Sequence, residues 1–310
     1  MIYHYGDGIH AVDAEFEREG FAAVYILESD GGAAIVDTAH RGSLPIALRA
    51  LPELGLSPES VKFVLLTHVH LDHAGGAGAY VERFGNARLV VHERGARHMV
   101  DPAKLLEGAR AVYGAEETER MYGVLVAVPQ DRVLVPKDGE RIALGSRTIV
   151  PLDTPGHARH HLTYFVEDAR AAFTGDVFGM NYPELESEGR QGIVPSTSPV
   201  QFDPAEMHRS IDRIVALSPA RIFPAHFGDV RDPATAADDM HRMIDWHVRA
   251  AVEAGGEIDA VREGLARGFE EECRIQRWPF PREEVRERLA PVIEMNAQGL
   301  AVWHARRERG

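Results

Sequence analysis

The segment Thr67-His68-Val69-His70-Leu71-Asp72-His73 decides how this sequence folds. It follows an apolar run, Val61 to Leu66, which predicts a strand buried on both faces. If the chain stays extended beyond this run, the first two histidines and the aspartate of the segment point the same way, because side chains alternate along a strand. The last histidine must then come from the turn that follows. Imidazole and carboxylate groups bind zinc and other borderline metals, and four of them in six residues suit two ions better than one.

Three further segments place a metal-binding group directly after an expected strand. They are Thr154-Pro155-Gly156-His157, Thr174-Gly175-Asp176 and Pro224-Ala225-His226. Each segment alone would more often be structural, but all three occur in the same chain as the first motif. We therefore interpret them together as ligands at the ends of strands.

The chain also repeats an order of elements. A strand that ends in Asp37 is followed by a helix, a strand and His68, and a strand that ends in Asp176 is followed by a helix, a strand and His226. This repeat predicts two sheets packed together with helices outside them. Asp37 has two equally good interpretations: an acceptor that fixes a ligand imidazole, or a turn cap.

Composition excludes several classes of protein. The 310 residues include 34 Lys+Arg and 48 Asp+Glu, a net charge of −14, which argues against a nucleic-acid-binding protein. No apolar run approaches the ~20 residues of a membrane span, and the N-terminal residues do not resemble a secretory signal. Cys273 is the only cysteine, so an intramolecular disulfide is impossible. We expect a cytoplasmic protein that acts on a small molecule and binds neither nucleic acid nor membrane.

The four motifs together resemble those of the metallo-β-lactamase superfamily, over roughly residues 1–230 in element order. The resemblance implies an α+β fold, a four-layer αββα sandwich with its site at one edge of the two sheets. It also implies two divalent metal ions. One ion would be bound by His68, His70 and His157, the second by Asp72, His73 and His226, with Asp176 bridging the two.

Such a metal pair predicts a hydrolase. Two metals can share a hydroxide and hold a carbonyl group, and a metal lowers the pKa of its bound water to roughly 7. Asp72 and Asp176 are the candidates to pass a proton during the reaction. We expect cleavage of an ester, thioester or lactone of a small, mostly apolar substrate, with zinc as the metal and iron or manganese as alternatives. A ligand-binding or regulatory protein with little turnover, or an iron-dependent redox enzyme, remains the alternative.

Local departures narrow the branch of the superfamily. His70 stands where the flavodiiron pattern has glutamate, which argues against oxygen reduction. The segment 177–183 lacks the Gly-Gly-x-Gly-Arg-type run of hydroxyacylglutathione hydrolases, which argues against glutathione substrates. The chain looks closest to a poorly characterised group of bacterial hydrolases, and its layout is similar to that of the quinolone-signal response protein.

We predict a catalytic domain over residues 1–231 and a helical extension over 232–310. The extension is helical in pattern throughout, with later helices at 258–270 and 282–306, the last interrupted by Pro291. Because amphipathic helices must bury their apolar faces, we expect the extension to form either a lid over the site or the interface of a homodimer.

Two further sets of side chains have alternative roles, in the site or in the ordinary structure. We expect His160 and His161 to lie at the entry of a strand and at the surface rather than in the site. A second set could form an apolar acyl pocket or belong to the ordinary core. Its members are Met99, Tyr113, Phe178, Met180, Tyr182 and Phe227.

Overall fold

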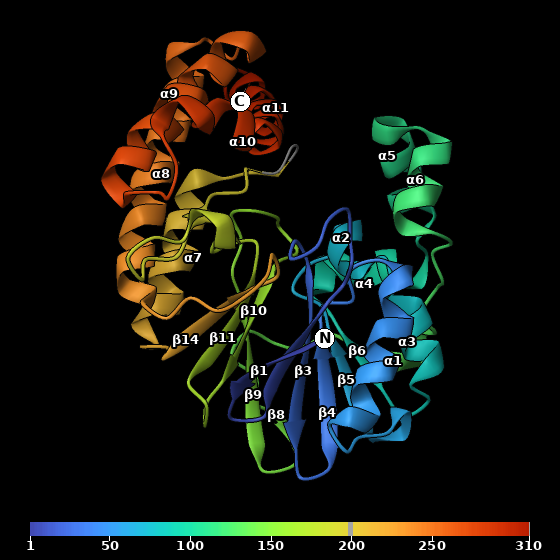
Figure 1. Ribbon diagram of the computed structural model, residues 1–310. Helices are drawn as coiled ribbons and strands as arrows, with labels where there is room; N and C mark the ends of the chain where they lie inside the picture. Colours follow the sequence, from blue (N-terminus) through green and yellow to red (C-terminus); the bar gives the residue numbers. More distant parts are fainter. Residues whose placement is uncertain (198–200, 310) are drawn as a thin grey trace. The chain divides into compact units, whose positions relative to one another are not determined.

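The computed structural model of this protein describes residues 1–197 and 201–309 and is drawn in Figure 1. These residues form two compact units. Unit 1 comprises residues 1–153, 160–175 and 222–229. Unit 2 comprises 154–159, 176–221 and the chain from 230 onwards, within the described residues. Gly310, the last residue of the predicted extension, lies outside them.

Unit 1 contains a seven-stranded sheet whose strands lie side by side in the order of the sequence. The strands are β1 (Ile2–Gly6), β2 (Ile9–Asp13), β3 (Ala23–Ser29), β4 (Gly32–Val36), β5 (Val61–Leu65), β6 (Arg88–Val90) and β7 (Val133–Leu134). The first three pairings are antiparallel and the next three are parallel. Because parallel strands end at the same edge of a sheet, β4 and β5 bring the residues that follow them close together.

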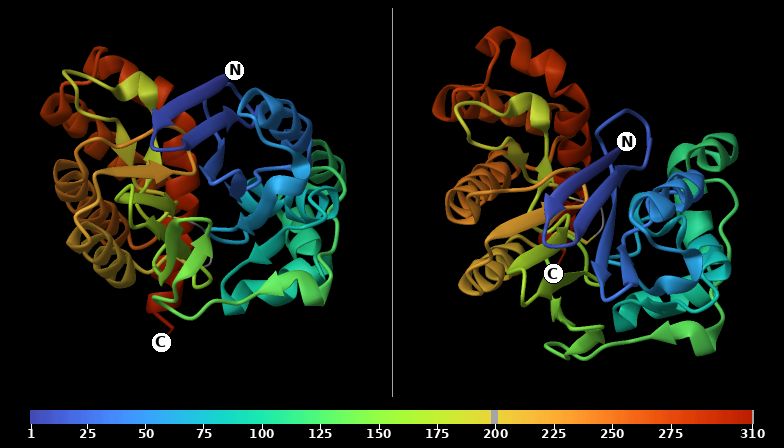
Figure 2. Two further views of the ribbon diagram at one scale, coloured as in Figure 1. Left: turned by 90° about the horizontal axis from the view of Figure 1, so that it is seen from below. Right: turned by 60° about the horizontal axis from the view of Figure 1, so that its bottom comes forward.

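The α-helices of unit 1 are α1 (Leu44–Glu53), α2 (Leu71–Ala74), α3 (Ala77–Arg83), α4 (Glu93–Val100), α5 (Ala103–Tyr113) and α6 (Ala115–Tyr122). Figures 1 and 2 show α1 and α3 along the outer side of the sheet. A buried cluster that includes Ile26 and Val64 of the strands and Leu51 and Tyr80 of the helices holds the two layers together.

A second, five-stranded sheet packs on the other face of the first. Its strands are, in spatial order, β14 (Arg221–Pro224), β11 (Ala171–Gly175), β10 (Leu162–Val166), β9 (Arg147–Asp153) and β8 (Ile142–Leu144). The ring of Tyr25 in the first sheet lies 5.3 Å from that of Phe173 and 5.6 Å from that of Phe223 in the second. The buried Tyr25 hydroxyl donates a hydrogen bond of 2.6 Å to the Pro224 carbonyl, so its polar end is satisfied inside this apolar layer.

Unit 2 is mainly helical. Its elements are β12 (Met180–Asn181), β13 (Ile193–Val194), α7 (Pro204–Ala216), α8 (Pro233–Glu253), α9 (Ile258–Gln276), α10 (Val285–Arg288) and α11 (Ala290–Arg307). Helices α7 and α8 begin at aspartate caps, since Asp203 accepts a hydrogen bond from the Glu206 N–H and Asp232 accepts one from the Thr235 N–H. Helices α8, α9 and α11 pack against one another within this unit.

The predicted α+β sandwich with C-terminal helices is confirmed, with local differences. α9 continues to Gln276 instead of ending near residue 270. Pro291 does not interrupt a helix but stands in the first turn of α11, where a missing N–H costs nothing. The boundary between a catalytic domain at 1–231 and an extension at 232–310 stays a prediction. Within the described residues, no helix is long and apolar enough to span a membrane.

Candidate metal centre

The turn after β4 and the turn after β5 are joined by the buried carboxylate of Asp37. Its two oxygens accept hydrogen bonds of 2.8 Å from the Thr67 N–H and from the Thr67 hydroxyl. Asp37 has a left-handed backbone, with φ of 55°, which an aspartate adopts more readily than most residues. The same carboxylate lies 3.6 Å from the Nδ1 of His73. Asp37 therefore supports a predicted ligand, as the first of its two interpretations requires, and does more than cap a turn.

The hydrogen bonds between Asp37 and Thr67 also determine the tautomer of His68. The Thr67 hydroxyl gives its proton to Asp37, so its oxygen accepts from the His68 Nδ1, 3.2 Å away. The His68 Nε2 is then the basic nitrogen, and it lies 2.9 Å from the Nδ1 of His70. Two ring nitrogens that converge in this way are suited to one metal ion.

A second group of donors gathers beside the first. One ligand atom from each of Asp72, His73 and His226 lies within 4.8 Å of the other two. The Asp72 carboxylate is 3.3 Å from the Nε2 of His73 and 3.7 Å from that of His226. Both histidines are buried and the aspartate is about a quarter exposed, so the donor set is one that divalent zinc, iron or manganese accepts.

The ring of His226 is held from behind by a backbone carbonyl. Its Nδ1 lies 3.0 Å from the Phe21 carbonyl oxygen, which can only accept, so Nδ1 carries the proton. Its Nε2 is therefore the basic nitrogen that lies nearer to Asp72. A backbone carbonyl in this position is a common support of a metal-binding histidine.

Unit 2 holds the two remaining predicted ligands, again close to each other. His157 and Asp176 are both buried, with 3.5 Å between the His157 Nε2 and a carboxylate oxygen of Asp176. The His157 Nδ1 donates to the Ser196 carbonyl at 3.2 Å, which again leaves Nε2 as the basic nitrogen. Before it, Gly156 has φ of 134°, and a Cβ there would lie 2.4 Å from the Met207 Cα. Only glycine fits this turn.

The seven predicted ligands thus fall into one group in each unit. His68, His70, Asp72, His73 and His226 gather in unit 1, and His157 lies beside Asp176 in unit 2. One local expectation is wrong, because the chain does not stay extended through Asp72. His70 is the last extended residue, and Asp72 and His73 both lie in the short helix α2.

The surface position expected for His160 and His161 is also wrong, although both residues do stand at the entry of a strand, β10. Neither is at the surface, since His160 is 8% exposed and His161 is fully buried. Their rings lie 6.2 Å and 5.2 Å from that of His68. The Nδ1 of His160 accepts a hydrogen bond from the Val69 N–H at 3.4 Å, within the first motif. Both residues therefore belong to the surroundings of the predicted ligands.

Comparison with known proteins agrees with this geometry. The family model described as the metallo-beta-lactamase superfamily matches residues 18–226. This chain belongs to the metallo-beta-lactamase superfamily.

Three relatives show how similar this chain is to other proteins. The metallo-beta-lactamase fold-containing protein ST1585 of Sulfurisphaera tokodaii is 27% identical over 80% of this chain and 89% of its own. The crystal structure of ST1585 matches 76% of this chain and 86% of its own, with a TM-score of 0.60. A hydroxyacylglutathione hydrolase of Fuscovulum blasticum is 26% identical over 85% of this chain and 78% of its own. The acyl-coenzyme A thioesterase MBLAC2 of Bos taurus is 26% identical over 56% of this chain and 64% of its own.

The candidate metal centre has aromatic neighbours that the sequence did not reveal. The ring of Phe21 lies 4.6 Å from that of His226, and Phe16 lies 6.5 Å from Phe21 and 5.8 Å from Tyr122. Burial, and next the charge of Asp72, raise the pKa of the Tyr122 hydroxyl above its ordinary value. Tyr122 is therefore within electrostatic reach of a predicted ligand.

Only part of the predicted acyl pocket has a suitable position. Met99 and Phe227 lie in the two buried cores of unit 1. Phe178 and Met180 are also buried, whereas half of the Tyr113 side chain is exposed. Burial, followed by the charge of Asp72, raises the pKa of Tyr113 as well, so this residue belongs with the newly found aromatic group.

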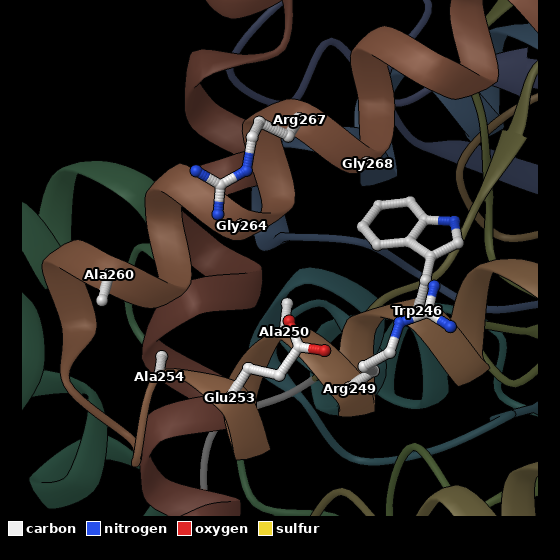
Figure 3. A pocket seen from close by; sticks show the side chains of 9 residues that line it. All are labelled: Trp246, Arg249, Ala250, Glu253, Ala254, Ala260, Gly264, Arg267 and Gly268. Atoms are coloured by element: carbon white, nitrogen blue, oxygen red, sulfur yellow. The ribbon is translucent and has the colours of Figure 1, made fainter.

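A pocket of about 310 Å³ lies between helices α8 and α9 of unit 2 (Figure 3). Its wall combines the Trp246 ring and small side chains with charged groups, including Arg249, Glu253 and Arg267. None of the seven predicted ligands lines it, so it is separate from the candidate metal centre.

Proposed function

We propose that this chain is a hydrolase that uses two divalent metal ions to cleave an ester, thioester or lactone bond. Its first ion would be held by His68, His70 and His157, and its second by Asp72, His73 and His226, with Asp176 shared between them. Membership of the superfamily and the order of the motifs along the chain support this assignment.

The observation that carries the proposal is a shared tautomer. His68, His157 and His226 each have Nδ1 against an acceptor, respectively a threonine hydroxyl and two backbone carbonyls. All three therefore offer Nε2 as a basic nitrogen next to another metal-binding group. Histidines that bind zinc usually have this arrangement.

The chemistry can be divided between the metals and the chain. When bound, two divalent ions supply a hydroxide at neutral pH and stabilise negative charge on a carbonyl oxygen. The chain's own contribution is orientation, through Asp37 and the carbonyls behind the ligand rings. The Asp72 carboxylate, which is the more exposed of the two aspartates, is suited to accept a proton during the reaction, and Asp176 is the second candidate. We expect zinc, and iron or manganese would fit the same donors.

The aromatic neighbours suggest the substrate class. Phe16, Phe21 and Tyr122 offer an apolar surface that begins at the ring of His226. An acyl or aryl group of a small molecule could lie along it while its carbonyl faces the metals. The names of two relatives, a hydroxyacylglutathione hydrolase and an acyl-coenzyme A thioesterase, favour thioesters among the three bond types.

The same proposal covers partners and location. We propose a small-molecule substrate and no nucleic-acid or membrane partner, because the net charge of −14 would repel both phosphate-rich surfaces. A single cysteine fits the reducing cytoplasm. Residues 232–310 would serve as a lid or as the interface of a homodimer.

The test is a substrate panel on the zinc-loaded protein. Acyl-CoA, aryl-ester and lactone substrates are compared for the unmodified chain, His68→Ala and a control, His98→Ala, which removes a partly buried histidine of α4. We expect hydrolysis of at least one class. The rate should fall by more than about 100-fold in His68→Ala, since changes behind the ligands alone cost roughly 10–100-fold. His98→Ala should keep the rate.

Two outcomes would contradict the proposal. A fully metallated protein that binds substrates of the panel but cleaves none of them would favour a ligand-binding role. Oxygen consumption by an iron-loaded sample, with no hydrolysis, would favour redox chemistry.

A further inference from the structure

An asparagine of the C-terminal helix holds the segment that supports His157. Asn296 lies in the interior of α11, and its side chain is fully buried. The Thr197 N–H donates to its Oδ1 at 2.7 Å, and its Nδ2 donates to the Pro195 carbonyl at 3.1 Å. The Thr197 hydroxyl donates to the same Oδ1 at 2.7 Å. Because an N–H only donates and a carbonyl only accepts, these contacts allow a single orientation of the amide.

The residue between those bonds is the one that supports His157. The Ser196 carbonyl accepts a hydrogen bond from the His157 Nδ1 at 3.2 Å. Along an extended chain, neighbouring residues turn their N–H and carbonyl groups to opposite sides. The bonds follow this alternation, since Pro195 and Thr197 face Asn296 while Ser196 faces His157. Asn296 therefore acts on His157 through the backbone of one intervening residue.

The small sheet of unit 2 does not extend to this segment. Within the residues that the structure describes, β13 pairs with β12 only through Ile193 and Val194, and the ladder ends there. The next residue, Pro195, has no N–H with which to continue it. The bonds from α11 therefore fix the direction of the Ser196 carbonyl.

Asparagine is a poor choice for this position on other grounds. Its short amide competes with the backbone of a helix interior, and a buried amide without partners costs free energy. The same face of α11 buries Ile293, Ala297 and Leu300, so an apolar side chain would suit the packing. The bonds to residues 195–197 explain why a polar side chain stands there.

We propose that Asn296 is a positioning residue for the metal ligand His157. By fixing residues 195–197 it keeps the Ser196 carbonyl on the Nδ1 of His157, so that Nε2 stays the basic nitrogen. Partners behind a ligand histidine fix its tautomer and ring orientation in this way. The proposal rests on the proposed function in that it takes His157 as a ligand. It gives the C-terminal helices a role that neither a lid nor a dimer interface requires.

The turn before His157 has a support of its own. The Asp203 N–H donates to the Gly156 carbonyl at 2.8 Å, and the Ser210 hydroxyl donates to the Pro155 carbonyl at 2.6 Å. Asp203 caps α7 and Ser210 lies within it, so α11 has no part in these bonds. Loss of the Asn296 amide should therefore leave the backbone of this turn in place and release only the imidazole ring.

The first test reads the tautomer of His157 in the metal-free, complete chain. Nitrogen-15 NMR separates protonated from basic ring nitrogens at about pH 8, where an ordinary imidazole is neutral. The His157→Ala chain identifies the signals of His157 by their absence. We expect one tautomer, with the proton on Nδ1, in the unmodified chain and a mixture of both in Asn296→Ala. Thr197→Val, which removes only the hydroxyl, should give a smaller share of the second tautomer.

The second test measures zinc affinity by competition with a chelator. Asn296→Ala should weaken the binding of the ion that His157→Ala fails to bind by roughly 10–100-fold. Thr197→Val should weaken it by about fivefold, the net effect of one hydrogen bond. Ser196→Ala keeps its carbonyl and should bind zinc like the unmodified chain. Leu300→Ala opens a cavity in the same face of α11, so it should lower the unfolding temperature but keep the tautomer and the affinity.

Three outcomes would overturn these assignments. An unchanged tautomer in Asn296→Ala, or an equal loss of affinity in Asn296→Ala and Leu300→Ala, would overturn the positioning role. If Asn296→Ala does not fold, an unchanged tautomer in Thr197→Val would do the same. Zinc content that is unchanged in His157→Ala would instead overturn the ligand assignment of the proposed function, whatever the tautomer shows.

Discussion

Lowering the pH should destabilise this protein through one buried histidine of α8. His247 is fully buried, and its Nδ1 donates to the Met243 carbonyl at 2.7 Å. Within the described part of the chain, its Nε2 has no hydrogen-bonding partner. The rings of Trp246 and Phe269 lie 4.0 Å and 5.4 Å from it. A proton on Nε2 would place an unpaired charge in these apolar surroundings, and burial accordingly lowers the pKa of His247 to about 3.

The size and sign of the effect follow from that shift. In the unfolded chain a histidine takes up a proton as the pH falls through about 6.5, whereas folded His247 stays neutral down to about pH 3. The unfolded state therefore binds more protons over this range, and the free energy of unfolding falls as the pH is lowered. One pKa unit corresponds to about 1.4 kcal/mol, so the decrease between pH 7 and pH 5 is about 2 kcal/mol.

Denaturant unfolding of the unmodified chain and of His247→Leu at pH 7 and pH 5 measures this contribution. Leucine has a similar size and does not titrate, so the decrease between the two pH values should be smaller by about 2 kcal/mol in the variant. The lost hydrogen bond to Met243 affects both pH values equally and cancels. His304→Leu, which removes a partly exposed histidine of α11, should keep the full decrease. An identical decrease in the unmodified chain and His247→Leu would refute the reasoning.

Two further changes test the supports of the candidate metal centre. Asp37→Ala removes the acceptor that orients Thr67 and His73. It should lower the affinity for zinc by roughly 10–100-fold, measured in a competition titration with a chelator. An unchanged affinity would mean that Asp37 only caps a turn. Gly175→Ala should lower the free energy of unfolding by about 2–4 kcal/mol, because its backbone is left-handed and a Cβ there would lie 2.6 Å from the Thr67 hydroxyl oxygen. Gly189→Ala is the matched control, since this glycine is also left-handed but a Cβ there meets nothing within 4 Å, and an equal loss in both variants would contradict the steric argument.

The strand-end ligands could be predicted because they depend on local order in the sequence. A strand that ends in a metal-binding residue is recognisable from the residues alone, and β5, β11 and β14 all end where the motifs begin. The parallel pairing of β4 with β5 then places Asp37 beside Thr67 without any further information.

The start of α2 was harder to predict. An extended chain and a short helix both bring histidines together over so few residues, and a four-residue helix has no recognisable periodicity. The structure has α2 from Leu71, so Asp72 and His73 face the site through helical geometry instead of strand alternation.

The surroundings of the site depend on contacts between distant residues, which one sequence does not display. His160 and His161 are buried against His68, 92 and 93 residues earlier, and polar residues near a strand start are exposed in most proteins. Phe21 likewise contacts His226, which lies 205 residues later in the chain. Only the packing of the two sheets brings these pairs together.

The central claim is that seven ligands hold two metal ions for hydrolysis. The most direct measurement is the recovery of activity when zinc is added stepwise to the metal-free chain. With the best substrate of the panel, we predict that the rate rises to a plateau at two equivalents of zinc, and that a chain that carries His68→Ala stays inactive. A plateau at one equivalent, or no activity at any zinc content, would contradict the account.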